Sequence, residues 1–75
     1  MGMVNKIKTG RNIGRLCEER SIQICELREM LELKSVTTIY KWYNGETIPS
    51  LKHAVNMARI FDVTVDEIYV LNERN

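Results

Sequence analysis

The sequence predicts an all-α domain made of five short helices, on three observations. Apolar residues recur every three or four positions over most of the chain, as they do on the buried side of a helix. Residue types that begin or end helices stand between these stretches. The chain has 75 residues, of which 44% are hydrophobic and 28% charged, which suits one small core. We therefore expect a single domain over residues 1–75, folded at about 9–70 and flexible at 1–8 and 72–75.

The first two helices are predicted from stripes of apolar residues. The first runs from about Thr9, its expected N-cap, to Arg20, and its inward residues are Ile13, Leu16 and Cys17. The second begins near Gln23 or Ile24 and ends by Glu32. Its inward residues are Ile24, Leu27, Met30 and Leu31.

The third helix, at about residues 36–44, has two faces of different character. Ser35 is expected to cap its start, and Gly45 is expected to end it in a left-handed conformation. One face carries the apolar and aromatic residues Ile39, Trp42 and Tyr43. The other carries hydrogen-bonding groups and one positive charge, on Thr37, Tyr40, Lys41 and Asn44. The first face suits a core, and the second suits a DNA groove.

Two further helices complete the prediction. The fourth follows Pro49, with Ser50 as its N-cap, and is expected to bury Leu51, Ala54, Val55, Ala58 and Phe61. Thr64 and Glu67 have the spacing of a capping box, which predicts a fifth helix that buries Val65, Ile68 and Tyr69. The apolar residues near the end of the chain either complete the core or form a dimer contact; they are Tyr69, Val70 and Leu71.

Charge is segregated along the chain, although the net charge is only +1. Residues 1–15 contain four bases and no acid, and residues 34–59 contain four bases and one acid. Acids predominate in residues 16–33 and 60–75. Positive charge gathered around the third helix and the N-terminal region is typical of a protein that binds a polyanion. A chance run of charges in so short a chain is the alternative.

Several functional classes are not expected. One histidine and two cysteines eight residues apart lack the spacing of a metal site, and we predict no metal, cofactor or small-molecule ligand. No nucleophile–base pair or phosphate-binding glycine loop can be assembled, which argues against an enzyme. No apolar stretch is long enough to span a membrane, and the start of the chain lacks a secretory signal. We therefore expect a cytoplasmic protein without a membrane partner.

The second and third helices would be joined by a tight turn, as in a helix-turn-helix. The segment ICELREMLELKSVTTIYKWYNGETIPSLKHAVNMARIFDVTVDEI resembles the phage-repressor/Cro-type (xenobiotic-response-element-like) helix-turn-helix family of bacterial and phage transcription regulators. Its most specific marks are the spacing of Ile39, Trp42 and Gly45, the run IPSL at residues 48–51, and the run FDVTVDEI at residues 61–68. With the first helix included, the resemblance covers about residues 9–70.

This resemblance implies a compact five-helix, lambda-repressor-like domain that binds double-stranded DNA, usually as a homodimer. The third helix would read the bases. Base contacts would fall on Val36, Thr37 and Lys41, and phosphate contacts on Asn44, on the start of the second helix and on the loop near Lys52. The complete predicted DNA-binding set is Lys34, Ser35, Val36, Thr37, Thr38, Tyr40, Lys41, Asn44 and Lys52.

Three departures from the family pattern lead to further expectations. The family commonly has glutamine where Ile24 stands, which leaves the phosphate contact at that position open. Glu32 replaces the usual glycine after the second helix, and because a left-handed glutamate costs roughly 1 kcal/mol, we expect a turn of another shape. Many relatives have an arginine–glutamate ion pair where Cys17 and Tyr43 stand. Since both members are replaced together, we predict that these two side chains pack near each other.

Two functional classes follow. The first is a sequence-specific DNA-binding regulator, specifically a repressor, whose dimer reads two half-sites about 34 Å apart. The second is a protein-interaction module on the same fold, such as an antitoxin-like partner or an accessory subunit. Salt separates the two, because a DNA reader with ~6–10 phosphate contacts loses orders of magnitude in affinity as the salt concentration rises.

Overall fold

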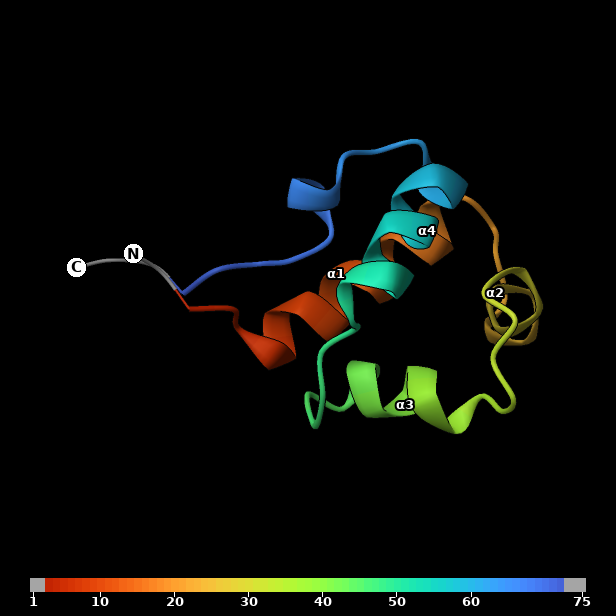
Figure 1. Ribbon diagram of the computed structural model, residues 1–75, viewed down its shortest axis with the longest axis horizontal. Helices are drawn as coiled ribbons and strands as arrows, with labels where there is room; N and C mark the ends of the chain where they lie inside the picture. Colours follow the sequence, from red (N-terminus) through yellow and green to blue (C-terminus); the bar gives the residue numbers. More distant parts are fainter. Residues whose placement is uncertain (1–2, 73–75) are drawn as a thin grey trace.

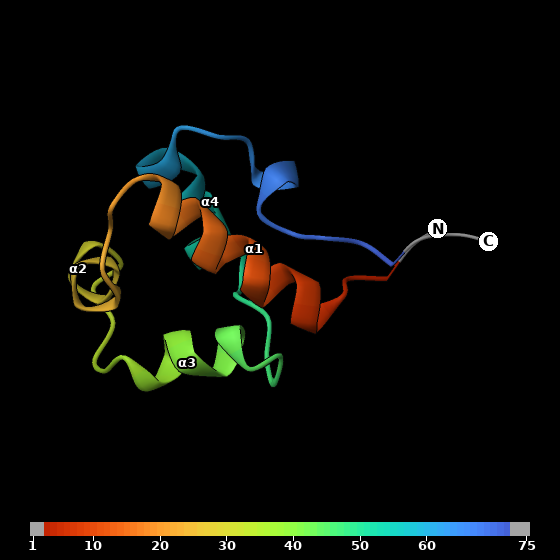
Figure 2. The ribbon, with the colours of Figure 1, turned by 180° about the vertical axis from the view of Figure 1, so that it is seen from behind.

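The computed structural model describes residues 3–72, and within them it contains four α-helices and one 3-10 turn. The elements in order are α1 (Lys6–Glu19), α2 (Ile24–Met30), α3 (Thr37–Tyr43), α4 (Leu51–Phe61) and the turn η1 (Val65–Glu67) (Figure 1). α4 lies in front of α1 in Figure 1 and behind it in Figure 2, while α3 runs along their lower side and α2 lies at one end. The prediction of an all-α fold is confirmed, and the prediction of a fifth α-helix is wrong.

One hydrophobic core joins all four helices and the segment that follows η1. Its buried apolar residues are Ile13, Leu16, Cys17, Leu27, Leu31, Ile39, Trp42, Ala54, Met57, Ala58, Phe61 and Ile68. Most of these residues are the ones that helical spacing predicts. Nowhere in residues 3–72 is a helix both long and apolar enough to cross a membrane.

Three residues predicted to be buried are exposed instead. Met30 is 49% exposed, Leu51 66% and Val55 36%. Met30 is the last residue of α2 and Leu51 is the first of α4, and both lie where their helix leaves the core. Val55 lies on the outer flank of α4. The buried stripe of that helix is Ala54, Met57, Ala58 and Phe61, in which Met57 was not predicted.

The start of α1 differs from the prediction. Asn5, not Thr9, is the N-cap, and its side-chain oxygen accepts a hydrogen bond from the Lys8 amide at 2.9 Å. Residues 6–8 therefore form the first turn of the helix. Thr9 is fully buried, and its hydroxyl oxygen accepts a hydrogen bond from the Val70 amide at 2.9 Å. Residues 1–2 and 73–75, which belong to the predicted flexible ends, lie outside the described residues.

The segment after α4 is tied to α1 by hydrogen bonds, and it does not continue as an α-helix. Thr64 forms the predicted capping box with Glu67, but only the three residues of η1 follow it. The Asn12 side-chain amide donates to the carbonyls of Glu67 at 2.7 Å and Ile68 at 3.0 Å. Beyond these residues the chain is extended. An isolated antiparallel bridge pairs Val4 with Leu71, and it is the sole β pairing in the part of the chain that the structure describes.

All four helices end at a residue with positive φ, and these residues are Ser21, Glu32, Gly45 and Asp62. After each of them, the next amide donates to the carbonyl five residues earlier, as in the Schellman motif; at α2, Leu33 donates to Arg28 at 3.0 Å. Glu32 has a φ of 56°. The expectation that this turn avoids a left-handed glutamate is therefore wrong, because the Schellman hydrogen bonds hold the backbone in that conformation.

Candidate nucleic-acid interface

The inner face of α3 fixes the rotation of the helix about its axis. Ile39 is fully buried and Trp42 is 2% exposed, which confirms the prediction for both residues. The Trp42 ring also lies against His53 of α4, with 5.8 Å between the ring centroids. Because these contacts hold one side of α3 against the core, they determine which side chains face outward.

A glycine in α1 allows this helix to cross α3 very closely. A Cβ atom on Gly10 would overlap the Trp42 carbonyl oxygen and lie 2.7 Å from the Trp42 carbonyl carbon. One turn later, a Cβ atom on Gly14 would meet only the Tyr43 ring, at 3.8 Å. The close contact at Gly10 therefore sets the distance between α1 and α3. This role of Gly10 was not predicted, because its only signal in the sequence is a glycine within a helical stretch.

Tyr43 lies beside Cys17, which confirms the prediction from the paired replacement. The Tyr43 hydroxyl donates a hydrogen bond to the Cys17 Sγ at 3.8 Å. Burial, together with the neighbouring thiol, raises the pKa of Tyr43. Burial also raises the pKa of Cys17, against a smaller opposing effect of the Tyr43 hydrogen bond. Both groups are therefore neutral near pH 7, and they join α1 to α3 without a buried charge.

The outward face of α3 carries the predicted polar row, which consists of Thr37, Tyr40, Lys41 and Asn44. All four residues are exposed. Among the described residues, the side chains of Tyr40, Lys41 and Asn44 have no hydrogen-bond partner in the protein. The Tyr40 and Tyr43 rings pack edge to face, with 6.4 Å between their centroids. This row is thus free to contact another molecule.

The remaining predicted contacts lie around the start of α3. Lys34 and Ser35 are exposed, while Val36 and Thr38 are half-buried. The helix is shorter than the predicted range 36–44 at both ends. Val36, not Ser35, is the N-cap, although the Ser35 hydroxyl still accepts a hydrogen bond from the Thr37 amide at 3.3 Å.

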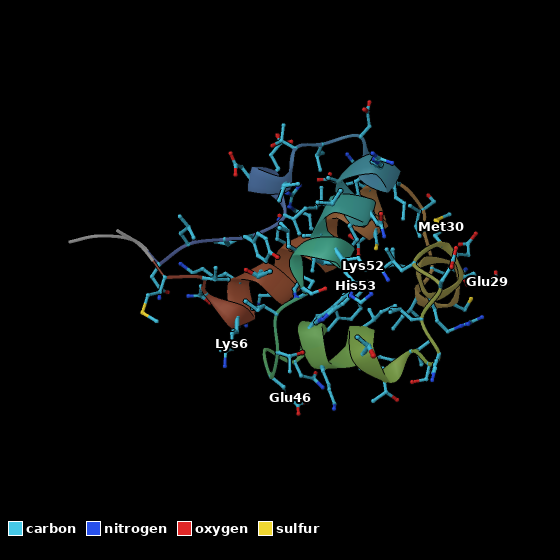
Figure 3. All side chains as sticks on the ribbon, viewed as in Figure 1. Lys6, Glu29, Met30, Glu46, Lys52 and His53 are labelled. Atoms are coloured by element: carbon cyan, nitrogen blue, oxygen red, sulfur yellow. The ribbon has the colours of Figure 1, made fainter. Side chains whose placement is uncertain are left out.

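Positive charge also lies at the start of α4, in addition to the lysines of α3 and its preceding loop. Ser50 is its N-cap, as predicted, and accepts a hydrogen bond from the His53 amide at 3.4 Å. Lys52 is exposed, and the first turn contains no acid. Figure 3 shows Lys52 and His53 at this helix start above α3, and Glu46 in the loop that follows α3. Free amides at a helix start favour anions, and Glu46 is the one opposing charge between residues 34 and 59.

These features describe an open surface. Residues 3–72 enclose no pocket, and they contain no cluster of three or more side chains that would hold a metal. The structure brings α3 and the start of α4 to one side of the molecule (Figure 1).

Comparisons with known proteins add a family and a fold. A family model described as helix-turn-helix matches residues 13–68. Among solved structures, the chain is similar to a transcriptional regulator from Listeria innocua, with a TM-score of 0.74 and 24% sequence identity. The match covers 88% of this chain and 62% of the Listeria chain, so this chain spans less than two thirds of that protein's length. No curated protein matches the sequence.

Proposed function

Because the chain belongs to the Cro/C1-type helix-turn-helix family, we propose that it is a transcription regulator that binds double-stranded DNA in a sequence-specific manner. The observation that carries this proposal is the polar row of α3. Its side chains are exposed and unpaired by protein groups within residues 3–72, while the opposite face of the same helix is buried. A helix held in this way fits the major groove, which is wide enough for an α-helix.

Bases are read by the beginning and the outward face of α3. The Lys41 ammonium group donates to guanine O6 and N7, which accept hydrogen bonds in the major groove. The hydroxyl of Thr37 contacts a base edge, and the half-buried Val36 contacts a thymine methyl group. Tyr40 lies at one edge of this row and Thr38 lies beside its other edge, and both limit which neighbouring bases fit.

Phosphates are bound on both sides of α3. Lys34 and Ser35 precede the helix, Asn44 ends it, and Lys52 lies in the first turn of α4. Contacts of this kind fix the position of the protein on the duplex without reading sequence. Their number determines how steeply affinity falls with salt.

The regulatory role that we propose is repression by a homodimer. Two copies on one face of the duplex would place their α3 helices about 34 Å apart, one turn of DNA. A bound dimer then blocks access to the operator, which requires no chemistry beyond DNA binding.

The test starts with selection of bound sites from a random duplex library. Lys41→Ala is then compared with Lys8→Ala, a matched control that removes the same charge from an exposed residue of α1. We expect Lys41→Ala to weaken binding to the selected site by a factor of about 5–150, the value of one base contact, and to relax the preference at one base. Lys8→Ala should leave the base preference of the selected site unchanged. The same loss of base preference in the two variants, or affinity that does not change with salt, would contradict the proposal.

A further inference from the structure

The start of α1 lies against the end of α3, where α3 and the loop after it carry no positive charge. Ile7 packs on Gly45, since a Cβ atom on Gly45 would lie 2.6 Å from the Ile7 Cγ1. α3 is followed by the neutral Asn44, its C-cap, and then by the exposed acid Glu46. A positive charge beside this end of α3 must therefore come from another element.

Lys6 supplies such a charge. It is the first residue of α1, it is exposed, and it precedes Ile7 in the chain. It shares one side of α1 with Gly10, four residues further on, which approaches the α3 backbone at Trp42. Figure 3 shows Lys6 on the lower side of the molecule, as it shows Glu46 and α3. Lys6 therefore adds an ammonium group to the surface that α3 forms.

The Lys6 ammonium group is not used inside the protein. Within residues 3–72 it forms no hydrogen bond or ion pair, and the ion pairs of this part of the chain join Arg15 and Arg20 to Glu19. The first 15 residues of the sequence contain no acid. An exposed ammonium group without an internal partner is available to a ligand of opposite charge.

The start of α2 offers a phosphate much less. Gln23 and Glu26 form a capping box, in which the Gln23 amide donates to the Glu26 Oε1 at 2.8 Å. This box uses amide groups that an anion would need, and it places a carboxylate in the first turn of the helix. The exposed acids Glu29 and Glu32 follow. Electrostatics therefore favour a phosphate at the start of α1 over one at the start of α2.

We propose that Lys6 binds a DNA phosphate beyond the end of α3, so that α1 forms part of the interface. Lys34 precedes α3 and Lys6 lies beside its end, so the two ammonium groups bracket the helix. The seven residues of α3 span about 10 Å, and the major groove is about 12 Å wide. Two lysines just beyond the ends of α3 can therefore reach the two phosphate backbones that border the groove.

The Lys6 contact has two effects. It helps to fix the position of α3 in the groove without reading a base, and it offsets the repulsion between Glu46 and the phosphates. This inference rests on the proposed function, since it adds a phosphate contact from outside the helix-turn-helix segment to the same DNA-binding surface.

The experiment compares Lys6→Gln with Lys8→Gln, which removes the same charge from the same turn of α1. Lys8 is also exposed, but it lies about 200° around the helix from Lys6 and so faces another way. Affinity for the selected site is measured over a range of salt concentrations. A second set of duplexes carries a neutral methylphosphonate in place of one phosphate at a time, which locates the contact on the backbone.

We expect Lys6→Gln to weaken binding by a factor of about 2–5 with unchanged base preference, and to lower the slope of log affinity against log salt concentration by about one. The effects of Lys8→Gln should be smaller. At one phosphate outside the base pairs that α3 reads, methylphosphonate should weaken binding by the unmodified protein and by Lys8→Gln, but not by Lys6→Gln.

Two results would overturn the inference while the proposed function stood. One is an equal effect of the two lysine variants, which would reduce the role of Lys6 to its net charge. The other is a Lys6→Gln variant that stays as sensitive as the unmodified protein to every methylphosphonate. If the unmodified protein bound no duplex, the proposed function and the inference would fail together.

Discussion

Gly10 is the position where one added carbon atom should have the largest effect on this fold. In Gly10→Ala, the new Cβ would overlap the Trp42 carbonyl oxygen and lie 2.7 Å from its carbonyl carbon. Carbon atoms in contact normally lie about 3.5–4.0 Å apart. The neighbouring atoms belong to the backbone of α3, which cannot rotate aside as a side chain can. α1 and α3 must therefore move apart by roughly 1 Å.

Two opposing effects determine the change in the free energy of unfolding. Alanine is favoured over glycine within a helix by about 0.5–1 kcal/mol. Overpacking typically costs about 1–3 kcal/mol and occasionally more, and here it separates the helices whose contact holds Trp42 and Ile39 in the core. We expect a net loss of about 1–2 kcal/mol, which lowers Tm by roughly 5–15 °C in a domain of this size.

Gly14→Ala is the matched control, because it makes the same change one turn further along α1. Its Cβ would meet only the Tyr43 ring, at 3.8 Å, which is an ordinary contact. This variant should gain about 0.5–1 kcal/mol from helix propensity alone. Urea unfolding, followed by circular dichroism and by the fluorescence of Trp42, measures both changes. If both alanine variants were equally stabilised, the close approach of α1 and α3 would be refuted.

Three further predictions concern a turn, a half-buried hydroxyl and a surface charge. Glu32→Gly should stabilise the domain by about 0.5–1 kcal/mol in urea unfolding, because glycine adopts positive φ without a steric cost. A loss of stability would show that the contacts of the glutamate side chain stabilise the domain by more than the strain of its backbone destabilises it. Because the pKa of Tyr43 is raised in the folded protein, the Tyr43 hydroxyl loses its proton at a lower pH in the unfolded chain than in the folded one. The free energy of unfolding should therefore fall above about pH 9–10. Tyr43→Phe should make this alkaline loss less steep, with Cys17 retaining its own part, and an unchanged slope in unfolding experiments would contradict the assignment. Glu46→Gln should tighten binding to the selected DNA site by a factor of about 2–5, because an acid close to phosphates is removed; unchanged affinity would place this loop away from the duplex.

The parts of the fold that follow from local sequence were predicted well. The two faces of α3 depend on the spacing of Ile39 and Trp42, and the end of the helix depends on Gly45, which has a φ of 73°. Each of these signals acts within a few residues, so it can be recognised without knowledge of the fold. The contact between Cys17 and Tyr43 was predicted because these residues together replace the two members of an ion pair found in many relatives.

The parts that depend on distant contacts were not predicted. Thr9 has the chemistry of an N-cap, but its hydroxyl bonds Val70, which is 61 residues away in the chain. Met30 and Leu51 continue the apolar stripes of their helices. However, Met30 is the last residue of α2 and Leu51 the first of α4, and both positions lie beyond the edge of the core. Helical spacing gives the direction in which a side chain points, and it does not show how far the neighbouring element extends.

The candidate site was predicted as a set of surface residues, and the structure shows that none of the predicted set is buried. Which of them contact bases and which contact phosphates depends on how the duplex lies against α3. That position is set by the tilt of the helix after the turn at Glu32, where the sequence departs from the family pattern. The assignments to Val36, Thr37 and Lys41 therefore stay predictions.

The most direct test of the central claim is an NMR titration of the isotope-labelled protein with its selected duplex. If the outward face of α3 reads DNA, the largest amide shift changes should occur at residues 34–44 and at the start of α4. The opposite surface of α1, where Arg15 pairs with Glu19 at 2.8 Å, should change little. Shift changes centred on α1, with α3 unaffected, would contradict the claim that this helix is the DNA-reading element.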